Sequence, residues 1–160
     1  MSDAVAPALP PDRLPDPLPI LPVAQILPHR PPMLLIDEVV GWEGENLTCR
    51  RTIAAGDPFL EGERFPGLAL LEVMAQAVAA QRGLIGLARG EPVRVGFLVG
   101  CRDVTLRVDT LAIGEELRVV VEPLTSFGLM ASYAARTFRG DEEIATAQIQ
   151  VAAKEDDPTP

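Results

Sequence analysis

Residues 68–87 read LALLEVMAQAVAAQRGLIGL, and this stretch decides the fold. It is dense in Leu, Ala, Val and Met, and before position 82 its only polar members are Glu72, Gln76 and Gln81. Such length and composition predict a helix that is apolar on nearly every side. A helix of this kind must be buried on most sides. We therefore expect other elements of the chain to enclose it.

Strand-like stretches lie on both sides of the predicted helix. On the N-terminal side, apolar residues at 33–36 and 39–40 lead through a glycine-containing turn into an alternating stretch at 47–53, which predicts a hairpin. On the C-terminal side, further strand-like stretches cover 93–99, 104–108, 117–124, 129–138 and 143–152. Short turns with glycine separate several of these stretches, as in antiparallel sheets.

Together these patterns predict an α+β fold, in which a curved antiparallel sheet of six or seven strands wraps around one long central helix. The sheet has one dry face for the helix. Its edge strands need protection from unwanted pairing. Dimerisation through paired edges would supply that protection.

The two ends of the chain differ from its middle. Most of the 16 prolines precede residue 33, where they remove backbone donors and restrict the chain. We predict an extended proline-rich arm at 1–22, one folded domain at 23–153 and a flexible charged tail at 154–160. No signal peptide or membrane span is expected from the sequence, so we predict a cytoplasmic protein.

The composition excludes several classes of function. The chain carries 14 Lys and Arg against 23 Asp and Glu, for a net charge of −9. Such a surface repels a nucleic-acid backbone. Two cysteines, Cys49 and Cys101, and one histidine, His29, cannot form a zinc site of the usual kind. We therefore expect neither nucleic acid nor a bound metal.

Two stretches of sequence resemble one enzyme family. Residues 27–39, LPHRPPMLLIDEV, and residues 65–77, FPGLALLEVMAQA, are similar to the opening segment and the central helix of the β-hydroxyacyl-acyl carrier protein dehydratases. Residues 113–117, IGEEL, add a weaker match. The resemblance is closest to the divergent dehydratase-like proteins of aryl polyene clusters. It implies the hotdog fold and the elimination of water from a 3-hydroxyacyl thioester, giving a trans-2-enoyl thioester.

The resemblance also implies partners and site residues. The substrate would be carried on the phosphopantetheine of acyl carrier protein or on coenzyme A, with no further cofactor, and the protein would be a homodimer or a heterodimer with a related hotdog subunit. Glu72 matches the family's acid, and burial should raise its pKa. Backbone N–H groups around Gly67 would stabilise the thioester oxyanion, and Gln76 would orient the carboxyl group. Further substrate-binding candidates are Arg64, Phe65 and Pro66.

The catalytic base is the point at which the chain departs from the family pattern. The loop that carries the family's histidine here reads GERFPG, residues 62–67, and contains no histidine. His29 is the remaining candidate for the base, and its alternative role is to anchor the N-terminal segment. Two other functions stay open: a thioesterase in which Glu72 activates water, and an acyl-binding subunit that has lost catalysis. Arg64, Arg94 and Arg102 are candidates for docking the phosphopantetheine or an acidic carrier.

Overall fold

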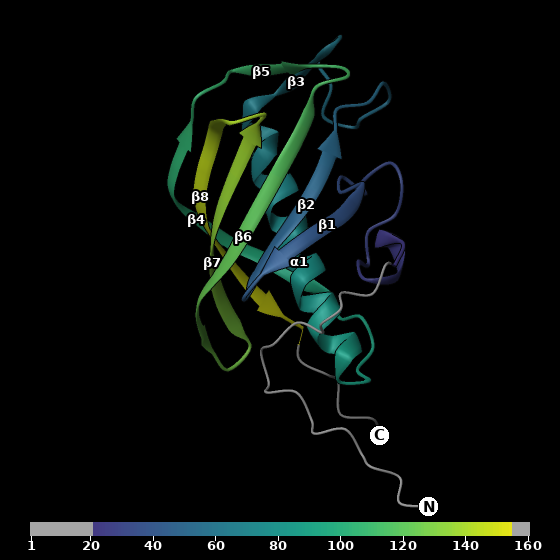
Figure 1. Ribbon diagram of the computed structural model, residues 1–160, viewed down its shortest axis with the longest axis vertical. Coiled ribbons are helices and arrows are strands. Elements are labelled where there is room, and N and C mark those ends of the chain that lie inside the picture. The colour runs from purple at the N-terminus through teal and green to yellow at the C-terminus, as the bar shows by residue number, and fades with distance from the viewer. Residues whose placement is uncertain (1–20, 155–160) are drawn as a thin grey trace, which may run out of the picture.

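The computed structural model describes residues 21–154 (Figure 1). The predicted arm and tail therefore lie outside the described residues, apart from Leu21, Pro22 and Lys154. Leu21, which the prediction assigned to the arm, packs against the core. A short 3₁₀ turn, η1 (Val23–Gln25), follows it.

One long helix and one large sheet make up the domain. The helix, α1 (Leu70–Ala88), follows a 3₁₀ turn, η2 (Gly67–Ala69). The sheet is antiparallel, with six strands in the order β1-β2-β6-β7-β8-β4. Their bounds are β1 (Glu38–Glu43), β2 (Asn46–Thr52), β4 (Gly96–Leu106), β6 (Glu116–Phe127), β7 (Met130–Arg139) and β8 (Glu142–Ala153). A second, two-stranded sheet pairs β3 (Arg64–Pro66) with β5 (Thr110–Ala112).

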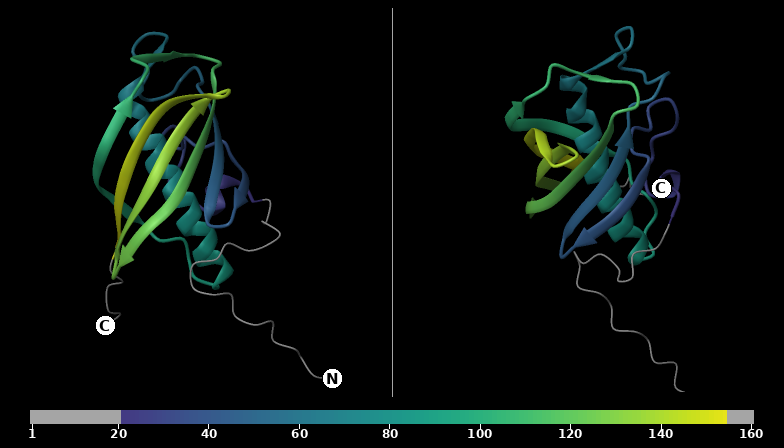
Figure 2. Two further views of the ribbon diagram at one scale, coloured as in Figure 1. Left: turned by 60° about the vertical axis from the view of Figure 1, so that its left-hand side comes forward. Right: turned by 45° about the horizontal axis from the view of Figure 1, so that its top comes forward.

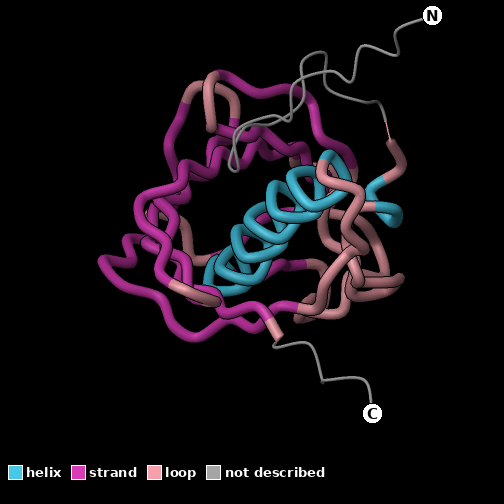
Figure 3. The backbone as a smooth tube through the Cα atoms, turned by 90° about the horizontal axis from the view of Figure 1, so that it is seen from below, coloured by secondary structure: helices cyan, strands magenta, loops and turns pink. Residues whose placement is uncertain are grey.

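The large sheet curves around α1 (Figures 2 and 3). Strands β2 and β7 alternate between buried and less buried positions, so each turns one row of side chains toward the helix. Val73, Met74 and Ala77 of α1 are fully buried, as are Leu47 of β2 and Val119 of β6. The predicted α+β architecture with a buried central helix is confirmed.

The predicted strands are mostly confirmed, with two differences. Residues 93–99 and 104–108 were expected to form two strands, but the structure has one long strand, β4, with irregular pairing between Leu98 and Gly100 and between Arg102 and Thr105. Asp103 within it has φ of +49°, which is the local break that the sequence pattern suggested. Residues 33–36 are not a strand, and their backbone instead runs along α1.

The N-terminal segment reaches α1 because Gly83 has no side chain. A Cβ atom at Gly83 would lie 2.0 Å from the backbone oxygen of Ile26, which is far closer than any real contact. Ile26 and Leu27 are buried against the core at this crossing. The crossing sets the position of the residues that follow, including His29.

The turn between β5 and β6 is held by a carboxylate. The side chain of Glu115 accepts hydrogen bonds from the backbone N–H of Ala112 and from the Arg139 guanidinium. Burial raises the pKa of Glu115, but these two hydrogen bonds and the charge of Arg139 outweigh burial and hold the pKa below its ordinary value. Glu115 therefore stabilises the fold in its ionised form.

By length and composition, the segment Gly67–Ala88 could cross a membrane, although 67% of its most apolar window is buried within the fold. Burial of this kind is typical of the core helix of a folded domain. The sheet edge formed by β4, in contrast, is exposed and apolar. Phe97, Leu98 and Val99 are 44–54% exposed.

Candidate active site

Glu72 and Gln76 lie one turn apart on the same face of α1. This spacing brings their side chains together, and the Nε2 group of Gln76 donates a hydrogen bond to Oε1 of Glu72 over 2.9 Å. The Glu72 side chain is 28% exposed, so it is less deeply buried in a single chain than the sequence suggested. The carboxyl group is therefore held by its neighbour and accessible.

Gln76 also ties the N-terminal segment to the helix. It is 1% exposed, and its Nε2 group donates to the backbone oxygen of Met33 over 2.7 Å. Its Oε1 atom accepts the backbone N–H of Leu35, also over 2.7 Å. One buried amide thus bonds both to the candidate acid and to the segment that follows His29, which confirms its predicted contact with Glu72.

His29 lies beside Glu72, although the two are 43 positions apart in the chain. Its Nε2 atom is 3.8 Å from Oε1 of Glu72, and its side chain is 30% exposed. That distance is too long for a hydrogen bond, but it is short enough to tighten when a substrate binds. Nδ1 of His29 is buried and has no hydrogen-bond partner within residues 21–154. Arg30 donates to the backbone oxygens of Leu27 and His29 and so stabilises this loop.

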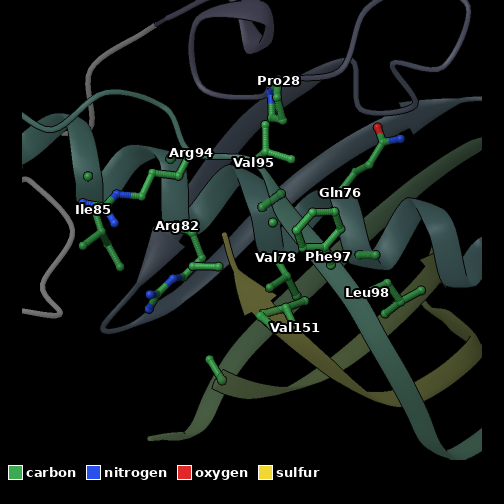
Figure 4. A pocket seen from close by; sticks show the side chains of 18 of the residues that line it. Pro28, Gln76, Val78, Arg82, Ile85, Arg94, Val95, Phe97, Leu98 and Val151 are labelled. Carbon is green, nitrogen blue, oxygen red and sulfur yellow. The ribbon is translucent and has the colours of Figure 1, made fainter. Parts of the chain in front are cut away.

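Both side chains line a cavity of about 160 Å³. Its walls come from one face of α1, the loop before β4 and the start of β4, the start of β7, the end of β8, and the segment that carries His29. Figure 4 shows Phe97 between Val78 and Leu98, with Gln76 nearby at one end. Most of the wall is apolar, and Glu72 and His29 supply acid–base groups at that end. A mostly apolar cavity with a few convergent polar groups is typical of a small-molecule site.

Four predicted site residues do not line this cavity: Arg64, Phe65, Pro66 and Gly67. Phe65 is completely buried and packs edge-on against Phe59, with ring centroids 6.3 Å apart. Arg64 and Pro66 belong to β3, which pairs with β5. The structure thus places Arg64, Phe65 and Pro66 away from the cavity of their own chain.

The predicted oxyanion donors were the backbone N–H groups around Gly67, and the N–H of Gly67 itself already has a partner in the single chain. This N–H donates to the backbone oxygen of Asp109 over 2.7 Å, so it is already used. A Cβ atom at Gly67 would lie 2.2 Å from the backbone oxygen of Val108. Gly67 is needed for close backbone packing between the start of the helix and the segment before β5.

Several cavity residues were not expected from the sequence. Phe97 and Leu98 line it, as do Arg82 and Arg89 of α1. Of the arginines expected to dock an anionic partner, Arg94 lines the cavity and Arg102 does not. The alternation at 93–99 indicated a strand, but it contains no signal for which element that strand would face.

The cysteines do not contribute to the site. Burial raises the pKa of the Cys49 thiol to about 12, which makes it unreactive near neutral pH. Within residues 21–154, no three His, Cys, Asp or Glu side chains come together in a way that could hold a metal ion. The polar chemistry of the cavity thus depends on His29, Glu72, Gln76, Glu91 and the arginines.

Comparison with known proteins agrees with this arrangement. The profile of the ApeP-like family, described as ApeP dehydratase, matches residues 21–159. The chain belongs to the ApeP-like dehydratase family. The 3-hydroxyacyl-[acyl-carrier-protein] dehydratase FabZ of Desulforamulus reducens is 30% identical over 136 residues, which cover 81% of this chain and 93% of that protein. FabZ of Dichelobacter nodosus is 32% identical over 140 residues, covering 79% and 90%.

Among solved structures, the dehydratase heterocomplex ApeI:P from Xenorhabdus doucetiae matches with a TM-score of 0.81 and 25% identity, over 86% of this chain and 93% of the matched one. The hotdog fold and the resemblance to the divergent branch are thereby confirmed. This ApeP-like chain is a dehydratase-type protein.

Proposed function

We propose that this chain eliminates water from a 3-hydroxyacyl thioester to give a trans-2-enoyl thioester, as the acyl carrier protein dehydratases that it resembles do. One observation carries the proposal: His29 and Glu72 lie 3.8 Å apart at one end of an apolar cavity. Elimination needs a base and an acid close to adjacent carbon atoms. No other histidine is present in the chain.

The proposed reaction uses His29 as base and Glu72 as acid. Nε2 of neutral His29 takes a proton from C2, the electron pair forms the C2–C3 double bond, and the C3 hydroxyl departs as water with a proton from the Glu72 carboxyl group. The site is left with an imidazolium beside a carboxylate. Because the two groups are neighbours, the proton can return directly to Glu72 and reset the pair.

Gln76 acts as a positioning residue in this scheme. It already donates to Oε1 of Glu72, so the acid proton is best placed on the other oxygen, Oε2. The hydrogen bonds of Gln76 to Met33 and Leu35 hold the segment that carries His29 at the same time. One side chain thus sets both the orientation of the acid and the position of the base.

We further propose that the substrate arrives as a thioester of phosphopantetheine, on acyl carrier protein or in coenzyme A, and that the protein works in the cytoplasm. The elimination breaks the C2–H and C3–O bonds with acid and base catalysis and involves no net oxidation or reduction, so it requires no redox cofactor. The exposed apolar edge of β4 supports pairing with a second hotdog subunit, either another copy of this chain or a related one. Burial of Phe97, Leu98 and Val99 would favour that pairing.

Mass spectrometry of a 3-hydroxyacyl-acyl carrier protein tests the reaction. The substrate is incubated with wild type, Glu72→Gln and His29→Gln. Loss of one water with wild type alone is the expected result. Release of free carrier thiol would show hydrolysis and support a thioesterase. An unchanged substrate with wild type would support the acyl-binding subunit, which the missing loop histidine favours.

A further inference from the structure

Three arginines line the same cavity as Glu72. They are Arg82 and Arg89 on α1 and Arg94 in the segment before β4. The chain has 14 Lys and Arg in total and a net charge of −9, so three guanidinium groups around one cavity are a marked concentration of positive charge. Glu91 also lines the cavity near these arginines, and its Oε2 atom lies 3.9 Å from Nη2 of Arg94.

The arginines are separated from the acid–base pair by an apolar stretch. Arg82 follows Glu72 by ten positions in the helix, which corresponds to about 15 Å along α1. Arg89 follows Arg82 by two turns and shares its side of the helix. Figure 4 shows Arg82 and Arg94 toward the end away from Gln76, with Val78 and Phe97 between. The cavity thus has an acid–base end, an apolar middle and a cationic end.

Helix-terminal electrostatics do not explain all of these charges. Arg89 directly follows the last helical residue, where a cation is favoured. Arg82 lies nearly two turns earlier, beyond the reach of that effect. Among the residues that the structure describes, no acidic side chain forms an ion pair with Arg82.

We propose that Arg82, Arg89 and Arg94 bind an anionic oxygen group of the substrate, about 15 Å from the carbon atoms that react. The inference rests on the proposed function for the position of those atoms. Guanidinium groups bind phosphate and carboxylate through paired charge-assisted hydrogen bonds. The anion is either the phosphate of the phosphopantetheine arm or a carboxylate at the far end of the acyl chain.

Binding of three unreactive probes to the full-length protein tests the proposal. Each probe is a thioether that carries the same saturated alkyl chain in place of the acyl group. The first is built on phosphopantetheine and the second on pantetheine, which lacks the phosphate. The third is built on pantetheine and has a carboxylate at the far end of the alkyl chain. Dissociation constants are measured by calorimetry for wild type, Arg82→Gln and Arg82→Gln/Arg89→Gln. Glutamine keeps part of the apolar stem and removes only the charge. Arg118→Gln is the control, because Arg118 lies over the Phe138 ring and does not line the cavity.

We expect wild type to bind one anionic probe about tenfold more tightly than neutral pantetheine, a typical effect of one partly exposed charge-assisted contact. Preference for the phosphate probe identifies the carrier arm, and preference for the carboxylate probe identifies the acyl end. The preference should disappear in the double variant and persist in Arg118→Gln. Equal affinity for all three probes, no binding of any probe, or a preference that survives the double substitution would overturn the proposal. Because the probes do not react, a protein that binds them as expected but releases no water would refute the dehydratase function alone.

Discussion

Replacing Gln76 with leucine removes three hydrogen bonds where α1 meets the segment that follows His29. The backbone oxygen of Met33 and the N–H of Leu35 lose their partner, and Glu72 loses the donor to its carboxyl group. Leu35 is fully buried. A buried polar group left without a partner costs about 1–3 kcal/mol. The Leu35 N–H is buried, whereas Met33 is 38% exposed, so the cost of one buried group sets the scale. We expect Gln76→Leu to lower the free energy of unfolding by about 1–3 kcal/mol.

The loss of activity should exceed the effect of unfolding. A small displacement of catalytic groups can lower the rate about 100-fold, so we expect kcat to fall by about that factor at temperatures where the variant is folded. Urea unfolding gives the stability, and initial rates of enoyl thioester formation give kcat.

Gln81→Leu is the matched control. Gln81 is also a buried glutamine of α1, and it donates to the backbone oxygen of Glu45, outside the cavity. The Gln81→Leu substitution should lower the free energy of unfolding and leave kcat nearly unchanged. Wild-type kcat in folded Gln76→Leu, or an equal loss of kcat in Gln81→Leu, would refute the positioning role of Gln76.

Three further predictions concern the fold. Gly83→Ala should lower the free energy of unfolding by about 1–3 kcal/mol, because its Cβ atom would clash with the backbone of Ile26. Gly86→Ala should have no such cost, because no atom would lie closer than 3.9 Å to its Cβ atom. Equal unfolding midpoints of the two variants in urea would contradict this prediction. Because the pKa of Glu115 is lowered in the folded state, Glu115→Gln should reduce the free energy of unfolding by up to about 1 kcal/mol at pH 7. The difference from wild type should shrink as the pH falls below the ordinary glutamate pKa of about 4.3 and through the lowered pKa of the folded state; a difference that keeps its size throughout an acid titration would argue against it. With a pKa of about 12, Cys49 should react with thiol reagents at neutral pH only after unfolding, and rapid labelling of Cys49 in the native protein would contradict its burial.

The sequence predicted the helix within one or two residues because its length and composition leave no alternative. Most strands were also predicted, because the alternation of apolar and polar residues in a strand can be recognised within a few neighbouring residues. The pattern did not show that 93–99 and 104–108 form one strand. Asp103 interrupts the alternation there with a left-handed backbone, and pairing with β8 continues past it.

The site was less predictable than the fold. Glu72 and Gln76 were expected to meet because four residues on a helix place them together. Nothing local indicated that His29 would reach Glu72, because their proximity depends on the crossing at Gly83 and on the hydrogen bonds of Gln76. Phe65 was assigned to the substrate from its position in the family motif, yet its ring faces the core. Side-chain direction in a strand of three residues cannot be inferred from a motif alone.

The most direct test of the central claim is the rate of water elimination in wild type, Glu72→Gln, His29→Gln and the double variant. If the two residues act as one acid–base unit, each single substitution should lower kcat by about 10²–10⁴-fold, and the double variant should be little slower than either. A His29→Gln variant that retains the wild-type rate would contradict the account, and so would single effects that multiply in the double variant.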